Sequence, residues 1–187
     1  MDVANRVILI TGASSGVGAA LAEQLAGMGA RVVVNYSRSA DAAEAVVSRI
    51  TSAGGQALAV QADVSEEADC KRLVAATIEQ FGQLDVLVNN AGTTTFVPHE
   101  QLEALTEEIW LRTLRVNLIG AFMMSREAAP HIGAAGGGEI IMTSSIASMT
   151  ANGSSIAYCA SKAGMNSLTR TLAKTLGKQK ILSLIHI

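Results

Sequence analysis

The sequence predicts a doubly wound α/β domain, in which a parallel β-sheet carries helices on both of its faces. Short runs of apolar, mostly β-branched residues alternate with longer segments whose apolar residues recur at helical spacing. The first of these runs continues through successive apolar residues, as expected of a strand covered by helices on both faces. The length of 187 residues suits one domain.

Five segments are predicted to be strands, the first two of them buried. Each is short and rich in Val, Ile, Leu or Ala, which is typical of a parallel sheet. Gln179–Ile181 looks like the beginning of a further strand. The five predicted strands are Arg6–Ile10, Arg31–Tyr36, Ala57–Gln61, Leu84–Asn89 and Glu139–Thr143.

Five further segments are predicted to be helices. Apolar residues three and four positions apart give each of them a face that can pack on the sheet. Gly29 and Gly82 follow two of these segments and are typical stop signals. The predicted helices are Ser14–Met28, Ala40–Ser52, a segment from Ser65 to Phe81, Thr106–His131 and Ser155–Leu176.

Composition and charge exclude several classes of protein. Apolar residues make up 49 % of the chain and charged residues 16 %, which excludes a disordered chain. The net charge of −2, with no cluster of Lys and Arg, argues against nucleic-acid binding. The three histidines are far apart and have no metal-ligand spacing, so we expect no metal site. Two cysteines are too few for a disulfide framework and fit a reducing cytoplasm.

The longest uncharged stretch, Ile140–Ser161, is long enough to span a bilayer. It contains many hydroxyl side chains, however, and burying them in hydrocarbon without partners is unfavourable. The N-terminus lacks the charged region and the cleavage site of a signal peptide. We therefore expect a soluble, cytoplasmic protein that does not act at a membrane.

The last six residues, 182–187, have an unusual sequence. Leu-Ser-Leu-Ile-His-Ile is the translation of the mosaic-end adapter DNA that transposase-based sequencing libraries contain. We therefore predict one domain over residues 1–181, incomplete at its C-terminus, followed by a non-native tail. A natural apolar strand is the alternative. A full-length transcript that carries these six codons would contradict the adapter hypothesis.

A glycine-rich turn joins the first predicted strand to the first predicted helix. Residues 11–18 are Thr-Gly-Ala-Ser-Ser-Gly-Val-Gly. Gly12 permits a tight turn, and Gly16 and Gly18 let the backbone approach a pyrophosphate and let the helix pack on the sheet. The unpaired N–H groups at the start of the helix favour an anion there. The place of this turn predicts a dinucleotide site, with a plain glycine-rich loop as the alternative.

The end of the second predicted strand bears on which dinucleotide binds. Sites for NAD place an Asp or Glu there, which accepts hydrogen bonds from the ribose 2′-hydroxyl. This chain has Ser37 and Arg38 instead, and a guanidinium pairs well with a 2′-phosphate. The alternative is that Arg38 is a solvated surface charge. The sequence therefore favours NADP, with NAD as a second possibility.

Tyr158 and Lys162 lie four positions apart and share one face of a predicted helix. An ammonium group beside a tyrosine favours its phenolate form, which suits proton transfer. Ser145 ends the fifth predicted strand, and ligands of such sheets bind at the carboxyl ends of the strands. These residues predict a catalytic site, although an isolated Tyr/Lys pair is more often an ordinary surface pair.

These motifs together resemble the classical short-chain dehydrogenase/reductase family. The family fingerprint Thr-Gly-x-x-x-Gly-x-Gly is matched at residues 11–18, and four further matches follow in family order. They are Asp63-Val64, Asn89-Asn90-Ala91-Gly92, Asn117, and Ser145 with Tyr158-x-x-x-Lys162. The resemblance runs from about Arg6 to Ile181 and implies a Rossmann-like fold.

The resemblance also implies roles for individual residues. Tyr158 would be the general acid/base, Lys162 would promote its ionisation and bind the nicotinamide ribose, and Ser145 would polarise the substrate oxygen. Ser144 is the nearest competitor of Ser145, and Asn117 would support a water-linked proton relay. The implied catalytic residues are Asn117, Ser145, Tyr158 and Lys162. The implied cofactor-binding residues are Gly12, Ser14, Ser15, Gly16, Val17, Gly18, Ser37, Arg38, Asp63, Val64, Asn90, Ala91, Gly92, Tyr158 and Lys162.

The implied activity is the NAD(P)-dependent interconversion of a ketone and a secondary alcohol, closest to that of the 3-oxoacyl-acyl-carrier-protein reductases. A sugar or polyol dehydrogenase of the same family is one alternative. An inactive nucleotide-binding fragment is another, because the family places its sixth and seventh strands and its substrate-covering loop after the position of Ile181. The expected partners are a small carbonyl or alcohol substrate, which an acyl carrier protein could carry, and further copies of this chain that pack through the last two long helices.

Overall fold

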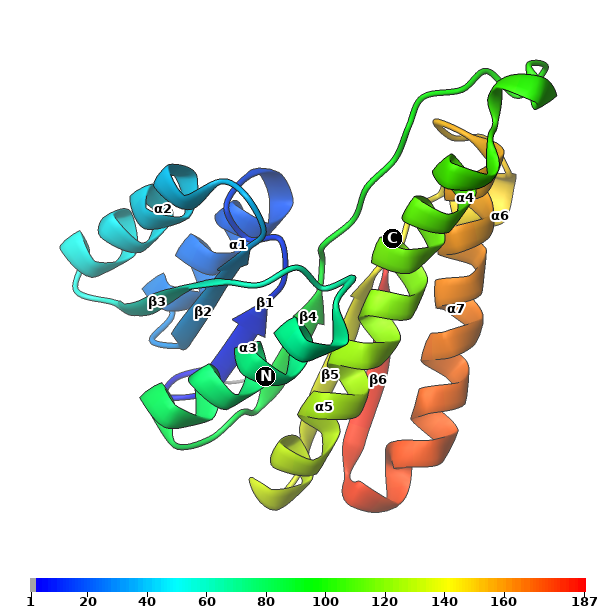
Figure 1. Ribbon diagram of the computed structural model, residues 1–187. Helices are drawn as coiled ribbons and strands as arrows, with labels where there is room; N and C mark the ends of the chain where they lie inside the picture. Colours follow the sequence, from blue (N-terminus) through cyan, green and yellow to red (C-terminus); the bar gives the residue numbers. More distant parts are fainter. Residues whose placement is uncertain (1–2) are drawn as a thin grey trace.

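The computed structural model describes residues 3–187 and shows a six-stranded sheet with helices on both faces (Figure 1). The strands are β1 (Val7–Ile10), β2 (Arg31–Tyr36), β3 (Gln56–Gln61), β4 (Val86–Asn89), β5 (Gly138–Thr143) and β6 (Ile181–His186). Their order is β3-β2-β1-β4-β5-β6, and the pairings are parallel. This result confirms the predicted doubly wound sheet, with its switch point between β1 and β4.

Two layers of helices cover the sheet. The longer helices are α1 (Gly16–Gly27), α2 (Ala40–Ser52), α3 (Glu67–Phe81), α5 (Ala121–Ala134) and α7 (Ile156–Leu176). Shorter segments are the 3₁₀ turns Leu102–Ala104 and Gly177–Gln179, α4 (Glu107–Leu114), a π-helix over Arg115–Gly120, and α6 (Ala147–Thr150). Helices α1 and α2 pack on one face, and α3, α5 and α7 pack on the other (Figure 1). Within residues 3–187, no helix is both long enough and apolar enough to cross a membrane.

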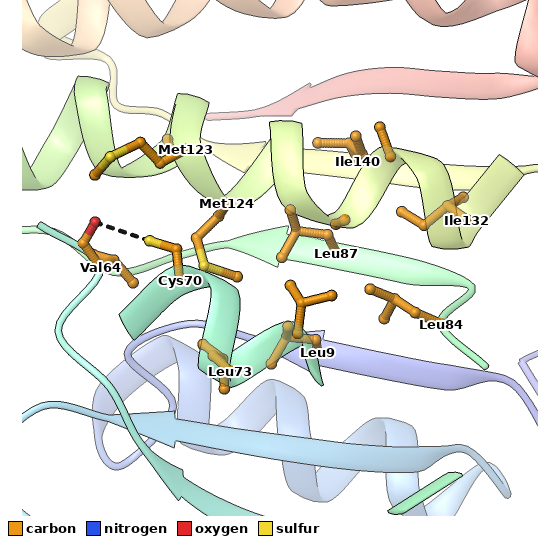
Figure 2. Packing of buried hydrophobic residues seen from close by; sticks show 14 of the residues in the cluster. Leu9, Val64, Cys70, Leu73, Leu84, Leu87, Met123, Met124, Ile132 and Ile140 are labelled. Atoms are coloured by element: carbon orange, nitrogen blue, oxygen red, sulfur yellow. Dashed lines mark hydrogen bonds between the residues drawn. The ribbon is translucent and has the colours of Figure 1, made fainter. Parts of the chain in front are cut away.

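Successive strand residues alternate between two apolar cores. In β1, Val7 and Leu9 belong to the core under α3, α5 and α7, whereas Ile8 and Ile10 belong to the core under α1 and α2. Figure 2 shows the first core, where side chains of the sheet such as Leu9 meet side chains of α5 such as Met124. Both faces of the strand are therefore buried, as its apolar sequence predicts.

Cys70 of α3 links this core to the loop after β3. Burial raises the pKa of its thiol to about 11, so the group stays neutral and donates a hydrogen bond to Val64 O at 3.3 Å (Figure 2). Cys159 of α7 is also buried, and a free cysteine in such a place packs as a small apolar side chain.

Helices α1 and α3 each begin two residues later than the sequence predicts. Gly12 and Gly16 adopt positive φ angles of 62° and 55°, which a right-handed helix excludes, so the turn extends to Gly16. Before α3, the N–H and hydroxyl groups of Ser65 both donate to Asp63 Oδ1, at 2.9 and 2.7 Å. This local turn delays the start of the helix.

The prediction of one uninterrupted α-helix over residues 106–131 is wrong in one respect. The backbone is helical from Glu107 to Ala134, but a π-helix over Arg115–Gly120 separates α4 from α5. A π turn inserts a single residue, so the apolar periodicity on either side hardly changes. The sequence pattern therefore does not predict the π-helix. The wide turn holds Asn117, one of the predicted catalytic residues.

Strand β6 extends further than the sequence predicts. Only its beginning was expected near Ile181, whereas it pairs with β5 from Gly138↔Ile181 to Thr143↔His186. Ile181 is buried, but Leu182 and Leu184 are 55 % and 40 % exposed. Pairing continues across residues 182–186 without a break, and the origin of residues 182–187 stays a prediction.

Candidate active site

A cleft of about 430 Å³ opens at the switch point of the sheet, beyond the carboxyl ends of β1 to β4. Its walls come from the loops after these four strands and from α4 and the π-helix. Ten of the predicted cofactor-binding residues line it, namely Gly12, Ser14, Ser15, Ser37, Arg38, Asp63, Val64, Asn90, Ala91 and Gly92. The cleft is also lined by six residues that were not predicted to bind the cofactor, namely Asn35, Ala62, Ser65, Thr93, Arg112 and Val116.

The glycine-rich turn passes very close to the loop after β4. A Cβ on Gly12 would lie 2.8 Å from the Cα of Ala91, and one on Gly18 would lie 2.5 Å from Asn90 Nδ2. Only glycine fits at these two positions. Gly16 meets nothing within 4 Å, so its positive φ, rather than crowding, explains the glycine.

The beginning of α1 forms one end of the cleft. Ser15 is the N-cap residue but its side chain makes no capping hydrogen bond, and the first turn contains no acidic residue. The N–H groups of this turn are therefore not satisfied by a side chain, and they favour an anion. Gly16, Val17 and Gly18 lie in this first turn, beside the residues that line the cleft.

Asn90 holds the glycine-rich turn in place through side-chain hydrogen bonds. Its Nδ2 donates to Thr11 O at 3.0 Å and to Gly12 O at 3.1 Å. Thr11 Oγ1 in turn accepts hydrogen bonds from the N–H groups of Asn90 and Ala91, both at 3.0 Å. The amide side chain of Asn90 is therefore used within the fold, and backbone atoms next to it remain to face the cleft.

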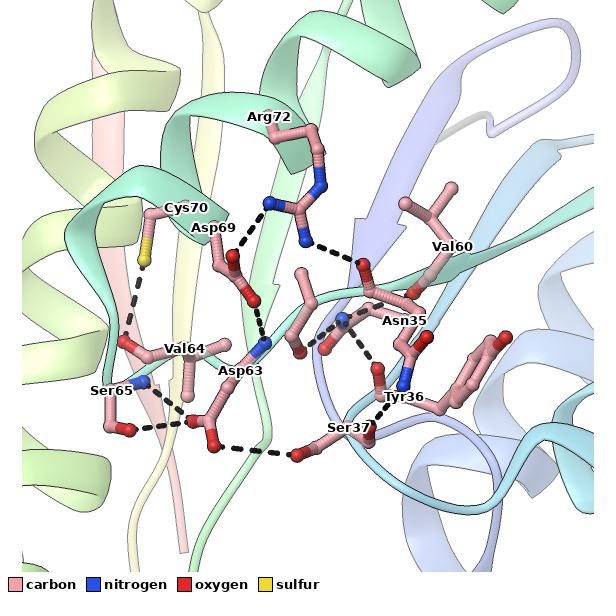
Figure 3. A network of polar contacts seen from close by, with 12 residues as sticks. Asn35, Tyr36, Ser37, Val60, Asp63, Val64, Ser65, Asp69, Cys70 and Arg72 are labelled. Carbon is pink, nitrogen blue, oxygen red and sulfur yellow. Dashed lines mark hydrogen bonds and ion pairs between the residues drawn. The ribbon is translucent and has the colours of Figure 1, made fainter.

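A polar network shapes the part of the cleft formed by the ends of β2 and β3 (Figure 3). Asn35 is buried, accepts from Gly12 N–H at 3.1 Å and donates to Ala62 O at 3.0 Å. Asp63 accepts from Ser65 and, at 3.4 Å, from the Ser37 hydroxyl. Hydrogen bonds from neighbouring residues thus fix the predicted cofactor contacts before any ligand binds.

The N–H of Asp63 is held by a second carboxylate, that of Asp69, at 2.8 Å (Figure 3). Arg72 pairs with Asp69 at 2.6 Å, and this hydrogen bond lowers the pKa of Asp69. Arg72 also donates to Gln61 O at 3.2 Å. In the described residues, no group of three or more His, Cys, Asp and Glu side chains could hold a metal ion.

Two arginines line the cleft without a partner. The side chains of Arg38 and Arg112 make no hydrogen bond or ion pair among the described residues, whereas those of Arg72 and Arg115 do. Asp63 is the only carboxylate among the lining residues. The cleft therefore offers unpaired positive charge. Arg112 has no signal in the sequence, because its place depends on how α4 packs.

Tyr158 and Lys162 share one face of α7 beside this cleft. Lys162 is 4 % exposed, its Nζ donates to Thr143 O at 2.7 Å, and it lies 5.8 Å from the centroid of the Tyr158 ring. Burial lowers the pKa of the Lys162 ammonium to about 8. A Cβ on Gly92 would lie 3.8 Å from Lys162 Nζ, so the lysine adjoins the wall of the cleft.

Asn117 ties the loop after β4 to α7. Its Oδ1 accepts from Thr93 N–H at 2.7 Å, and its Nδ2 donates to Thr93 O at 2.9 Å and to Ser161 Oγ at 3.0 Å. Both amide hydrogens are used within the protein. The side chain therefore has no hydrogen left to donate to a water molecule.

The two neighbouring serines after β5 have different surroundings. Ser144 is buried and its hydroxyl donates to Asn166 Oδ1 at 2.6 Å. Ser145 is half-buried, and its Oγ accepts from Ala147 N–H at 3.2 Å, which leaves its own hydrogen available. A Cβ on Gly153 would touch both Ala147 Cβ, at 2.9 Å, and Tyr158 Cδ1, at 3.4 Å. The turn that carries Ser145 thus lies next to Tyr158.

The model of one protein family, described as short chain dehydrogenase, matches residues 6–185. The chain belongs to the short chain dehydrogenase family. It is 46 % identical over 171 residues to a Streptomyces violaceoruber protein named as a ketoacyl reductase of the granaticin polyketide synthase, covering 91 % of this chain and 67 % of that protein. It is 39 % identical to a 3-oxoacyl-[acyl-carrier-protein] reductase of Synechocystis, covering 94 % and 70 %.

This short chain dehydrogenase is also similar to solved structures. A dehydrogenase/reductase from Sinorhizobium meliloti 1021 superposes with a TM-score of 0.90 at 37 % identity, covering 97 % of this chain and 71 % of that one. The chain spans about two thirds of the length of the curated relatives named above. Family and fold together make it an oxidoreductase of CH–OH and ketone groups and imply a nicotinamide dinucleotide. The glycine-rich turn, with no side chain at positions 12, 16 and 18, and the unpaired arginines of the cleft fit such a dinucleotide.

Proposed function

We propose that the protein is an NADP-dependent reductase that interconverts a ketone and a secondary alcohol, of the 3-oxoacyl reductase type. The observation that carries this proposal is that Lys162 and the turn after Ser145 both adjoin Tyr158, and that Lys162 also adjoins Gly92 in the wall of the cleft. A non-catalytic nucleotide-binding protein would not need a buried lysine beside a tyrosine at this point. Turnover of a 3-oxoacyl thioester with NADPH tests the proposal directly.

The side chains of this protein transfer one proton and bind the substrate oxygen atom. A bound nicotinamide supplies or accepts the hydride. The Tyr158 hydroxyl donates its proton to the substrate oxygen during reduction and takes it back during oxidation. The nearby ammonium of Lys162 stabilises the phenolate that remains. The free hydrogen of Ser145 is donated to the same substrate oxygen and polarises the carbonyl.

We assign Asn117 a supporting part in this proton transfer. Since both hydrogens of its amide bind within the protein, it acts by holding Thr93 against α7, beside Ser161. A water-linked relay at this point would use acceptor atoms of Asn117 rather than its amide hydrogens.

The residues at the mouth of the site favour an acyl substrate over a sugar or polyol. Phe96, in the loop after β4, is 76 % exposed, and Ile146 and Met149, beside Ser145, are 56 % and 65 % exposed. The loop is joined to the segment between α6 and α7 through Ser154, whose carbonyl accepts from Val97 N–H at 2.8 Å. Apolar side chains here suit an alkyl chain. The names of two relatives, a ketoacyl and a 3-oxoacyl-[acyl-carrier-protein] reductase, support the same choice, and the acyl group could be carried on such a protein.

Arg38 is expected to select NADP over NAD. Replacing Arg38 with Ala should weaken NADPH binding by about 1–3 kcal/mol, the scale of a charge-assisted contact, and should barely change NADH binding. Fluorescence titration of both dinucleotides measures the two affinities. Arg170→Ala, which removes an exposed arginine of α7, is the matched control and should change neither. Equal losses for NADPH and NADH would rule out a 2′-phosphate contact.

We also propose that copies of the chain associate through the helical surface formed by α4, the π-helix, α5 and α7. Leu111, Ile119 and Phe122 on this surface are 60 %, 40 % and 42 % exposed. Light scattering should show a dimer or tetramer at micromolar concentration, and Phe122→Glu should shift it toward monomer because it buries a charge. A strict monomer of the unchanged protein would contradict this proposal.

A further inference from the structure

Three hydrogen bonds in series connect Ser144 to the backbone of Ser145. The Ser144 hydroxyl donates to Asn166 Oδ1 at 2.6 Å, and Asn166 Nδ2 donates to Ser148 Oγ at 2.8 Å. The Ser148 hydroxyl then donates to Ser145 O at 2.6 Å. Ser144 begins the series as a donor, and Asn166 and Ser148 each accept one hydrogen bond and donate the next. The three hydrogen-bond directions are therefore mutually consistent. The series passes through helix α7 and returns to the turn that carries Ser145.

Asn166 lies four positions after Lys162 and eight after Tyr158, so the three side chains are on the same face of α7. Lys162 holds Thr143 O, and Asn166 holds the Ser144 hydroxyl. Helix α7 therefore fixes the two residues that precede Ser145 with two of its own side chains. Through Ser148, Asn166 also fixes the carbonyl group of Ser145 itself.

Apolar packing does not hold this turn in place. Ile146 and Met149 are 56 % and 65 % exposed, and only Ala147 of the turn is fully buried. The position of the Ser145 hydroxyl therefore depends on hydrogen bonds. Asn is the side chain that fits this role, because its amide accepts from one serine and donates to the other at the same time.

We propose that Asn166 is a positioning residue that sets the place of the Ser145 hydroxyl relative to Tyr158. This inference rests on the proposed function, in which Ser145 polarises the substrate oxygen. Asn166 does not touch the substrate. It acts through Ser148 and Ser144, and displacement of a catalytic group by about 1 Å can lower a rate about 10²-fold.

The first test compares steady-state kinetics. Asn166→Ala should lower kcat about tenfold to a hundredfold while the Kd of NADPH stays within about twofold, because Asn166 does not line the dinucleotide cleft. Ser144→Ala breaks only one end of the series and should lower kcat less. Thr171→Ala is the matched control, since its hydroxyl bonds only to Ser167 O of the same helix. An Asn166→Ala protein with the wild-type kcat would overturn the inference.

A double variant separates positioning from a general loss of structure. In the Ser145→Ala background, Asn166→Ala should lower kcat by less than about twofold further, because the group that it positions is already absent. A residue that only stabilises the fold would lower kcat by the same factor in both backgrounds. Equal factors would therefore contradict the proposed role of Asn166.

Hydrogen exchange tests the same idea without turnover. The N–H of Ser148 is bonded to Ser145 O at 2.9 Å, and Asn166→Ala should speed its exchange at least about tenfold, unlike Thr171→Ala. Unchanged exchange would overturn the inference. If the wild-type protein reduces no carbonyl substrate but this amide loses its protection, the proposed function fails while the positioning of the Ser145 turn stands. If the wild-type protein is active and both assays show no effect, only the inference about Asn166 fails.

Discussion

Tyr158→Phe should lower kcat by roughly 10²–10⁴-fold, the range of general acid–base catalysis. The substitution removes one hydroxyl and keeps the ring that packs near Gly153, so the fold and the Kd of NADPH should stay near wild type. Reduction of a 3-oxoacyl thioester, followed at the absorbance of NADPH, measures kcat. Dinucleotide titration of the same preparation measures binding.

The chain provides a matched control for this variant. Tyr36, the other of its two tyrosines, ends β2 on the opposite side of the switch point. Tyr36→Phe removes an identical hydroxyl and should leave kcat within about twofold of wild type. A Tyr158→Phe protein that turns over within about twofold of wild type would show that another group protonates the substrate.

Lys162→Met should abolish most turnover and weaken dinucleotide binding together, because it removes both the charge beside Tyr158 and a group at the cleft wall. The same variant should nevertheless increase the free energy of unfolding at neutral pH. Burial lowers the pKa of Lys162 to about 8 from an ordinary value of 10.5, so folding disfavours its charged form. Met has a similar length and carries no charge to bury.

The effect of Lys162 on stability has a defined pH window. Below pH 8 the lysine is charged in both the folded and unfolded states, and its full burial penalty is present. Between about pH 8 and 10.5 the folded state has lost the proton while the unfolded state still binds it, so wild-type stability rises with pH. The free energy of unfolding of wild type minus that of Lys162→Met should increase across this window, by at most about 3 kcal/mol.

Urea unfolding of the dinucleotide-free protein at pH 7, 9 and 10.5 would measure this difference. Subtracting the variant removes the contribution of other titrating groups. Lys174→Met, an exposed lysine near the end of the same helix, is the control and should show a much smaller change. A difference that stays flat between pH 7 and 10.5 would contradict the link between burial of Lys162 and stability.

Local features of the sequence predict most of the sheet and the dinucleotide end of the site. The glycine turn is predictable because Gly12 is required by its backbone angle and by close approach, and Gly18 by close approach. Both requirements are met by a glycine at the position itself, which is visible in the sequence. The strands are predictable because each is apolar on both faces.

Contacts between distant segments explain what the sequence could not predict. Asn166 and Ser148 are 18 positions apart, and Asn117 and Thr93 are 24 apart, so no local sequence pattern predicts their hydrogen bonds. Arg112 faces the cleft only because of how α4 packs. The π-helix is hidden for another reason, since it changes the backbone pattern while keeping the apolar periodicity.

Strand β6 has a consequence for how the protein behaves at high concentration. Among residues 3–187 it lies at one edge of the sheet, so one row of its backbone N–H and C=O groups is unpaired there, and the segment 181–187 contains no Pro, Lys or Arg to discourage pairing. Its exposed leucines add an apolar surface along the same edge. Open edges of this kind recruit strands of other molecules and seed aggregates. A large particle in light scattering could therefore arise from edge-to-edge aggregation, and only particles that keep a fixed size on dilution would report the ordered association of helices.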